Sequence, residues 1–191
     1  MPIIDKNSIQ KAVQNGCHAG APDYNLFQPT SVMVLFIFNK EVELLFIQKA
    51  DVKGYPWANQ MAFIGGHRDK NDISAKDTAL RELTEEAGIL QENVDVIGSL
   101  GHFQTINNKD IEAFAGIWNQ RDIIKHDTAE ISRVFQIPLN YLIAHHKKKE
   151  FHREKPNIMQ MTYPFEDVVI WGVTAKILHH LINSLLQNNN L

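Results

Sequence analysis

One segment of this sequence, residues 65–89, limits what the chain can form more than any other. It begins with two glycines, continues through a polar loop, and takes on helical spacing over residues 75–87. Ser74 is followed three residues later by Asp77, which is typical of a capping box at the start of a helix. Gly88 stands where such a helix would end. The sequence therefore predicts a glycine turn, a polar loop and then a capped helix.

Three glutamates lie on one side of this helix. Glu82, Glu85 and Glu86 are spaced i, i+3 and i+4, so their side chains project from one face of two successive turns. Leu83 and Ala87 occupy the other side, where they are expected to pack against the rest of the protein. The helix thus presents an apolar face and an acidic face.

Like charges on one face destabilise an isolated helix by a few tenths of a kcal/mol per pair, roughly, and a divalent cation among them removes that cost. Clustered carboxylate oxygens suit Mg²⁺ or Mn²⁺, and the absence of cysteine among them disfavours zinc. The alternative is a solvated acidic helix whose charge is compensated by Arg81 and nearby lysines. Spacing alone leaves both open.

The rest of the chain predicts short strands interspersed with helices. Strands are expected over 32–38, 42–48, 61–64, 94–103, 111–118 and 131–137, and further helices over 6–14 and 167–186, with a helical turn over 138–143. Residues 145–155 are interpreted as a charged surface loop. Periodicity alone indicates an α/β or α+β class.

Composition supports a folded protein and excludes several function classes. The chain has 191 residues, 44% hydrophobic and 21% charged, with 19 basic against 22 acidic residues and a net charge of −3. This is the balance of one ordinary globular domain, and it argues against binding nucleic acid or anionic membranes through bulk positive charge. We therefore expect a single domain over residues 1–191, with a core at about 30–186 and an N-terminal extension at 1–29.

The location of the protein is also predicted from the sequence. Cys17 is the only cysteine, so no internal disulfide can form and a reducing compartment is favoured. The longest apolar run, Val32 to Phe38, has seven residues, whereas a membrane helix needs about twenty. Asp5 comes early, with no apolar stretch behind it, so no secretory signal is expected. These features predict a cytoplasmic protein without membrane association.

The string Arg81-Glu82-Leu83-x-Glu85-Glu86-x-Gly88-Ile89 after Gly66 resembles the Nudix box, the motif of hydrolases that cleave nucleoside diphosphates linked to another moiety. Five residues separate Gly66 from Asp72, where the common box has Glu, and eight rather than seven separate Asp72 from Arg81. Both departures resemble the coenzyme A pyrophosphatase branch of the family.

Segments outside the box are similar to the same branch. Gln60-Met61-Ala62-Phe63-Ile64-Gly65-Gly66 resembles the signature before the box, with Ile64 where Pro is expected. Residues 130–142 and 170–175 resemble downstream stretches of the branch. The resemblance covers roughly residues 30–182.

This resemblance implies the α/β/α sandwich of Nudix domains, with a mixed β-sheet, and the activity of a pyrophosphohydrolase that uses Mg²⁺ or Mn²⁺. The metal ligands it implies are the carbonyl of Gly65 or Gly66 together with Glu82, Glu85 and Glu86. Arg81 would orient a glutamate of the helix through a forked ion pair. Either Glu86 or Glu130 would act as the base.

The substrate implied by the resemblance is coenzyme A or an acyl derivative, giving 3′,5′-ADP and 4′-phosphopantetheine. One alternative is ADP-ribose, a dinucleotide or a nucleotide sugar, which Ile64 in place of Pro keeps open. Another is a nucleotide sensor without turnover, in which box glutamates would be replaced, but all three are present here. The family also implies frequent homodimers, although no segment identifies an interface.

Some basic residues have two interpretations. His67 and Arg68 follow the glycines and either contact a phosphate or serve only as polar loop residues. Lys147, Lys148 and Lys149 would meet the 3′-phosphate of a coenzyme A or, as the run itself favours, form a solvated surface.

Overall fold

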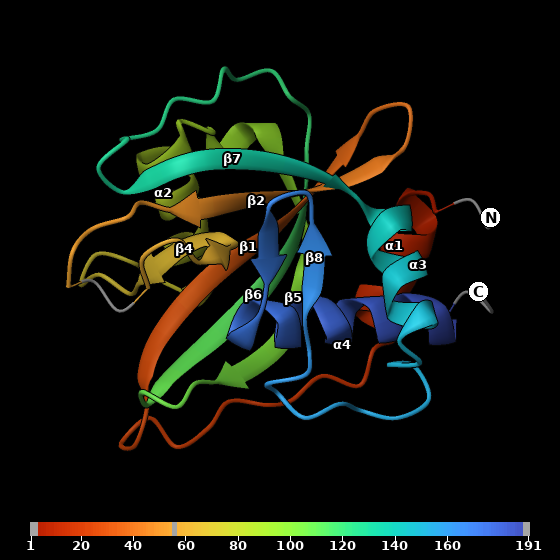
Figure 1. The fold of residues 1–191 in the computed structure, drawn as a ribbon. Helices are drawn as coiled ribbons and strands as arrows, with labels where there is room; N and C mark the ends of the chain where they lie inside the picture. The colour runs from red at the N-terminus through yellow and green to blue at the C-terminus, as the bar shows by residue number, and fades with distance from the viewer. Residues whose placement is uncertain (1–3, 55–56, 189–191) are drawn as a thin grey trace.

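The computed structural model describes residues 4–54 and 57–188 as a mixed β-sheet between two layers of helices (Figure 1). The α/β/α sandwich expected from the sequence is confirmed. The elements are α1 (Lys6–Gln14), β1 (Gln28–Phe38), β2 (Val42–Lys49), β3 (Met61–Ala62), β4 (Ile64–His67), α2 (Ala75–Ala87), the 3-10 turn η1 (Gln91–Asn93), β5 (Val94–Gln104), β6 (Lys109–Trp118), β7 (Ile131–Pro138), α3 (Leu139–Lys148), β8 (Tyr163–Phe165), β9 (Val168–Ile170) and α4 (Gly172–Asn188).

The main sheet has the strand order β3-β2-β1-β6-β5, with β4 also paired to β1 and β7 also paired to β2. Strands β1 and β6 run parallel, from Gln28 opposite Lys109 to Ile37 opposite Trp118. The other strand pairs are antiparallel. The parallel pair brings the start of β1 beside the start of β6, and β4 lies beside the same end of β1.

Strand β1 is buried on both faces, as its continuous apolar run requires. Val34 and Phe36 pack in the cluster that contains α1, α3 and α4. Leu35 and Ile37 pack on the other face, in the cluster that contains Leu83 of α2. Figure 1 shows the same division, with α2 on one side of the sheet and the other three helices on the opposite side.

The N-terminal segment is part of the core. Helix α1, predicted over residues 6–14, is confirmed, and Asp5 caps it by accepting a hydrogen bond from the Ser8 N–H at 2.8 Å. The helix packs on α4 and β5, with Ile9 fully buried. Residues 28 and 29, placed in the extension by the sequence, belong to β1.

The predicted elements differ from the structure in several places, and residues 61–67 form the two strands β3 and β4 instead of one strand over 61–64. Helix α3 extends through His146, which is fully buried, so the charged run 145–148 is the end of a helix rather than a surface loop. Residues 163–165 and 168–170 form a hairpin that the sequence analysis did not predict. The last helix therefore begins at Gly172 instead of residue 167. Strands of three residues are too short to produce a recognisable alternation.

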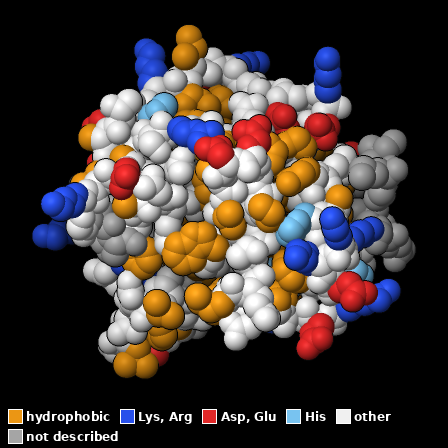
Figure 2. All heavy atoms as spheres, viewed as in Figure 1, with side chains coloured by type: hydrophobic (Ala, Val, Ile, Leu, Met, Phe, Trp, Pro, Cys, Tyr) orange, Lys and Arg blue, Asp and Glu red, His pale blue; other side chains and the backbone are white. Residues whose placement is uncertain are grey.

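Charges on the face drawn in Figure 2 are interspersed, and no large basic area covers this view. This agrees with the nearly balanced count of acidic and basic residues. None of the described helices is long and apolar enough to cross a membrane.

Acid is expected to destabilise the fold through His146. Its ring accepts a hydrogen bond from the Tyr163 hydroxyl at 2.9 Å and contacts the Asn183 Oδ1 at 3.0 Å. Burial lowers the pKa of His146 from 6.5 to about 4. As the pH falls, the unfolded chain therefore takes up a proton at this histidine before the folded protein does. The stability that the buried neutral ring contributes is complete above pH 6.5 and is lost as the pH falls towards 4.

Urea unfolding at several pH values between 7 and 4 measures this effect. We expect His146→Gln to flatten the fall in stability, while His126→Gln, in the loop before β7, keeps it. Equal slopes in the wild type and the His146 variant would contradict the assignment.

Candidate active site

A cavity of about 700 Å³ opens beside α2, the glycines of β4 and the end of β2. Five of the residues that the sequence singled out line it: Gly66, Arg81, Glu82, Glu86 and Glu130. Glu85 is not among the described residues that line this cavity, and its side chain is 58% exposed. The structure therefore brings most of the predicted site together and leaves Glu85 outside the described lining of the cavity.

Local geometry fixes the helix next to Gly65 and Gly66, which belong to strand β4 rather than to the turn that the sequence predicted. The capping box of Ser74 and Asp77 is formed, and Gly88 ends the helix with a φ of 68°. Strand β4 pairs with β1, which places Gly65 opposite Val32. A Cβ atom at Gly65 would collide with the Ser31 carbonyl oxygen, so this close approach of two backbones requires glycine.

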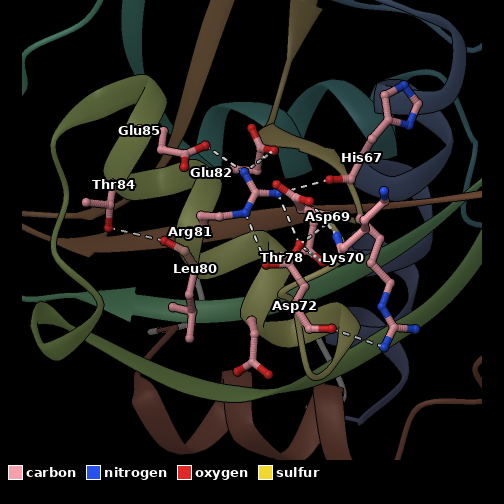
Figure 3. A network of polar contacts seen from close by, with 12 residues as sticks. His67, Asp69, Lys70, Asp72, Thr78, Leu80, Arg81, Glu82, Thr84 and Glu85 are labelled. Carbon is pink, nitrogen blue, oxygen red and sulfur yellow. Dashed lines mark hydrogen bonds and ion pairs between the residues drawn. The ribbon is translucent and has the colours of Figure 1, made fainter.

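Arg81 joins the helix to the loop before it (Figure 3). Its Nε and Nη2 donate to the two carboxylate oxygens of Asp72, both at 3.1 Å. Its Nη1 lies 2.8 Å from Glu82 and 2.6 Å from Glu85, and Nη2 also donates to the His67 carbonyl at 3.0 Å. The predicted forked ion pair of Arg81 therefore exists, but with Asp72 of the loop rather than with a glutamate of the helix.

Asp72 is the most strongly bound carboxylate of this network. Its side chain is 5% exposed. Besides Arg81, Asp72 Oδ2 accepts hydrogen bonds from the Thr78 hydroxyl at 2.9 Å and the Asp69 N–H at 2.8 Å. The hydrogen bonds from Arg81 lower the pKa of Asp72 from 3.8 to about 2, and the same pair raises the pKa of Arg81. The pair therefore stays ionised at neutral pH and anchors the loop to α2.

The two carboxylate oxygens of Glu86 have different surroundings in the cavity. Lys49 Nζ lies 3.0 Å from Glu86 Oε1, and the two side chains are only 17% and 11% exposed. The second oxygen, Oε2, is buried and has no hydrogen-bond partner among the described residues. Burial also raises the pKa of the neighbouring Glu82. Buried carboxylate oxygens without donors are costly unless a further cation binds them.

The residues present fit a divalent cation. Glu82 and Glu86 supply oxygen donors on adjacent turns of one helix, and Oε2 of Glu86 needs a positive partner. Within residues 4–54 and 57–188 no group of three or more His, Cys, Asp and Glu side chains already stands in metal-binding geometry. The Glu85 carboxylate faces Arg81 instead. A cation here would therefore depend on Glu82 and Glu86 together with backbone or substrate oxygens.

Gly66→Ala is expected to impair the site while leaving the fold stable. A Cβ atom at this position would collide with the carboxylate of Glu82, which can move aside because it ends a flexible side chain. We expect metal affinity or kcat to fall by about 10- to 100-fold with little change in Tm. Gly20→Ala is the matched control, since an added Cβ meets nothing within 4 Å there. Full activity in the Gly66 variant would contradict this role of the close contact.

Two lysines of the cavity were not recognised as site residues in the sequence. Lys49 ends β2 and Lys109 starts β6, and both line the cavity. His67 and Arg68 line it too. Only the pairing of distant strands brings these cations to α2, so no local pattern could have identified them. The run 147–149 is not among the described residues around the cavity.

Comparisons with known proteins agree with this geometry. Residues 28–161 match the NUDIX domain family. The "Uncharacterized Nudix hydrolase NudL" of Pectobacterium atrosepticum is 29% identical over 154 residues, covering 79% of this chain and 79% of that protein. The protein of the same name in Yersinia pestis is 30% identical over 154 residues, covering 79% and 76%.

Solved structures share the fold. A MutT/nudix family protein from Enterococcus faecalis has a TM-score of 0.53 and 18% identity, covering 97% of this chain and 80% of that one. An Ap4A hydrolase from C. elegans, in a binary complex, has a TM-score of 0.50 and 19% identity, covering 65% and 89%. At these identities the likeness concerns the fold alone.

Proposed function

This chain belongs to the Nudix family, and on that premise we propose that it is a divalent-metal-dependent pyrophosphohydrolase. The single observation that carries the proposal is the buried Oε2 of Glu86, which has no partner within the described chain, in a cavity that Glu82 and Glu130 also line. Such an oxygen is stabilised by a bound cation, and hydrolysis of a pyrophosphate needs one.

Glu82 and Glu86 would hold Mg²⁺ or Mn²⁺, with the Gly66 carbonyl as a further oxygen donor and Glu85 joining if its contact with Arg81 loosens. When bound, such a cation neutralises phosphate oxygens and lowers the pKa of water. Arg81 keeps Glu82 in place through a direct ion pair, and Lys49 does the same for Glu86. Both basic residues thus position the carboxylates before substrate arrives.

Glu130 is the proton acceptor in this proposal. It lines the cavity, and its carboxylate makes no hydrogen bond or ion pair with any residue in the described part of the chain. Glu86, the other candidate, is already engaged by Lys49. A carboxylate free of donors is the better acceptor for a proton from water.

Coenzyme A or an acyl derivative is the substrate we propose, giving 3′,5′-ADP and 4′-phosphopantetheine. The support comes from the resemblance around Asp72 and in residues 60–66. The structure gives Asp72 a defined part, since it receives the fork of Arg81.

A panel assay tests the proposal. Coenzyme A, acetyl-coenzyme A, ADP-ribose, NADH and a nucleotide sugar would each be incubated with Mg²⁺ or Mn²⁺, and the products of pyrophosphate cleavage would be separated and quantified by ion-exchange chromatography. We expect coenzyme A to be the best substrate. Preferential turnover of ADP-ribose or a nucleotide sugar would retain the hydrolase and reject this substrate, while metal binding without any turnover would favour a nucleotide sensor.

A further inference from the structure

The cations around the cavity fall into two groups. Lys49 and Arg81 are paired with carboxylates beside Glu86 and Glu82. Arg68 and Lys109 form no ion pair with any acidic side chain in the described part of the chain. Two positive charges that line a cavity without acidic partners are suited to an anion from outside the protein.

Lys109 is held in position by a short polar chain. Its ammonium can only donate, so His67 Nε2 accepts this hydrogen bond, at 3.0 Å. The proton of the neutral ring then lies on Nδ1, which faces the Thr30 hydroxyl at 3.3 Å. Thr30 lies opposite His67 in the pairing of β1 with β4, so the sheet itself fixes this chain.

Arg68 is anchored on one side only. Its Nη2 donates to the carbonyl oxygens of Asp72, at 3.3 Å, and Ile73, at 2.9 Å. The Nε and Nη1 groups have no partner within the described chain. An arginine fixed by one nitrogen still presents donors for a phosphate oxygen.

The acidic residues nearby keep their own charge, but within the described chain none of them forms an ion pair with Arg68 or Lys109. Asp110, next to Lys109 in β6, is 1% exposed and accepts from His102 at 2.6 Å and Gln104 at 2.7 Å. Asp69 lines the cavity and accepts from the Lys70 N–H at 2.5 Å. We call the surface formed by His67, Arg68 and Lys109 the basic wall; it carries two cations that no carboxylate in the described part of the chain pairs with.

A second hollow of about 250 Å³ continues past the basic wall. It shares Thr30 and Arg68 with the main cavity and is also lined by Tyr24, Asp110 and Glu112. The residues thus follow one order: the glutamates of α2, then the basic wall, then a hollow with an aromatic ring. A nucleotide with a pyrophosphate, a phosphorylated ribose and a base has its groups in that same order.

We propose that the basic wall binds a phosphate monoester on the ribose of the substrate, beside the pyrophosphate that is cleaved. This inference rests on the proposed function and deepens it, because it selects 3′-phosphorylated adenosine derivatives over those without that phosphate. The pyrophosphate itself lies at the glutamate end, where Lys49 and Arg81 are already paired. The unpaired cations therefore serve a second anion.

Calorimetric binding of two nucleotides that the enzyme cannot hydrolyse tests this directly. Adenosine 3′,5′-bisphosphate is expected to bind the wild-type protein, with Mg²⁺ present, at least about tenfold more tightly than adenosine 5′-monophosphate. Lys109→Met is expected to remove most of this preference. Lys147→Met, at a helical position that does not line the cavity, is the matched control and should keep it.

Equal binding of the two nucleotides by the wild type would overturn the inference without any variant. An equal loss for both in Lys109→Met would also overturn it, since the wall would then bind the 5′-phosphate. Turnover of coenzyme A and dephospho-coenzyme A separates the two proposals. If adenosine 3′,5′-bisphosphate binds more tightly but neither coenzyme is hydrolysed, the proposed hydrolase activity is rejected and the phosphate site at the basic wall is kept. If both coenzymes are hydrolysed equally and the two nucleotides bind equally, the hydrolase activity is kept and the phosphate site is rejected.

Discussion

Glu86→Gln is expected to lower kcat by about a thousandfold, the largest effect of any single substitution considered for this protein. The change keeps the size of the side chain and its contact with Lys49. It removes the charge from the group whose buried Oε2 has no partner among the residues that the structure describes. An amide binds a divalent cation weakly, so metal affinity should fall together with the rate.

Initial rates with coenzyme A at several Mg²⁺ concentrations measure this loss, and the thermal midpoint checks the fold. Glu92→Gln is the matched control, because Glu92 lies in η1, is exposed and does not line the cavity. A Glu86 variant with wild-type rate at saturating Mg²⁺ would show that Glu86 has no part in the reaction.

Asp72→Asn is expected to have the largest effect on stability, about 3 kcal/mol. Asp72 Oδ2 accepts three hydrogen bonds, from Arg81, Thr78 and the Asp69 N–H. An amide in this place leaves part of the Arg81 charge without its partner, in a site where the Asp72 side chain is 5% exposed. The pKa of Asp72 near 2 keeps the pair ionised, so the loss should be constant above about pH 4.

Urea unfolding at pH 7 measures this difference in the free energy of unfolding. Asp95→Asn is the matched control, since the Asp95 carboxylate pairs with Lys6 at the surface with 61% of its side chain exposed, and it should cost less than about 1 kcal/mol. If both variants lost equally little, the network around Arg81 would not be what anchors the loop to α2.

Features that depend on neighbouring residues were predictable from the sequence. The capping box and the glycine end of α2 follow from local spacing and are confirmed. Of the three glutamates expected on one face, Glu82 and Glu86 line the cavity, whereas Glu85 is not among the described residues that line it. Helix α1 was predicted at its observed bounds for the same reason. The cavity lining that includes Glu82 and Glu86 is a direct consequence of this local order.

Features that depend on strand pairing were not predictable. Lys49, Lys109 and Thr30 lie far apart in sequence and reach the cavity only because β2, β6 and β4 all gather around β1. The fork of Arg81 goes to Asp72 because the loop folds back over the helix, whereas the family resemblance implied a fork to a glutamate, which Arg81 contacts through Nη1 only. Non-local contacts of this kind leave no periodic signal in one sequence.

Phosphorus NMR of coenzyme A incubated with the protein and Mg²⁺ is the most direct test of the central claim, which is that this cavity hydrolyses a pyrophosphate with the help of Glu86. The account predicts that the pyrophosphate signals are replaced by those of 3′,5′-ADP and 4′-phosphopantetheine in the wild type, and that they persist with Glu86→Gln. Persistent pyrophosphate signals in the wild type, or equal conversion by the variant, would contradict it.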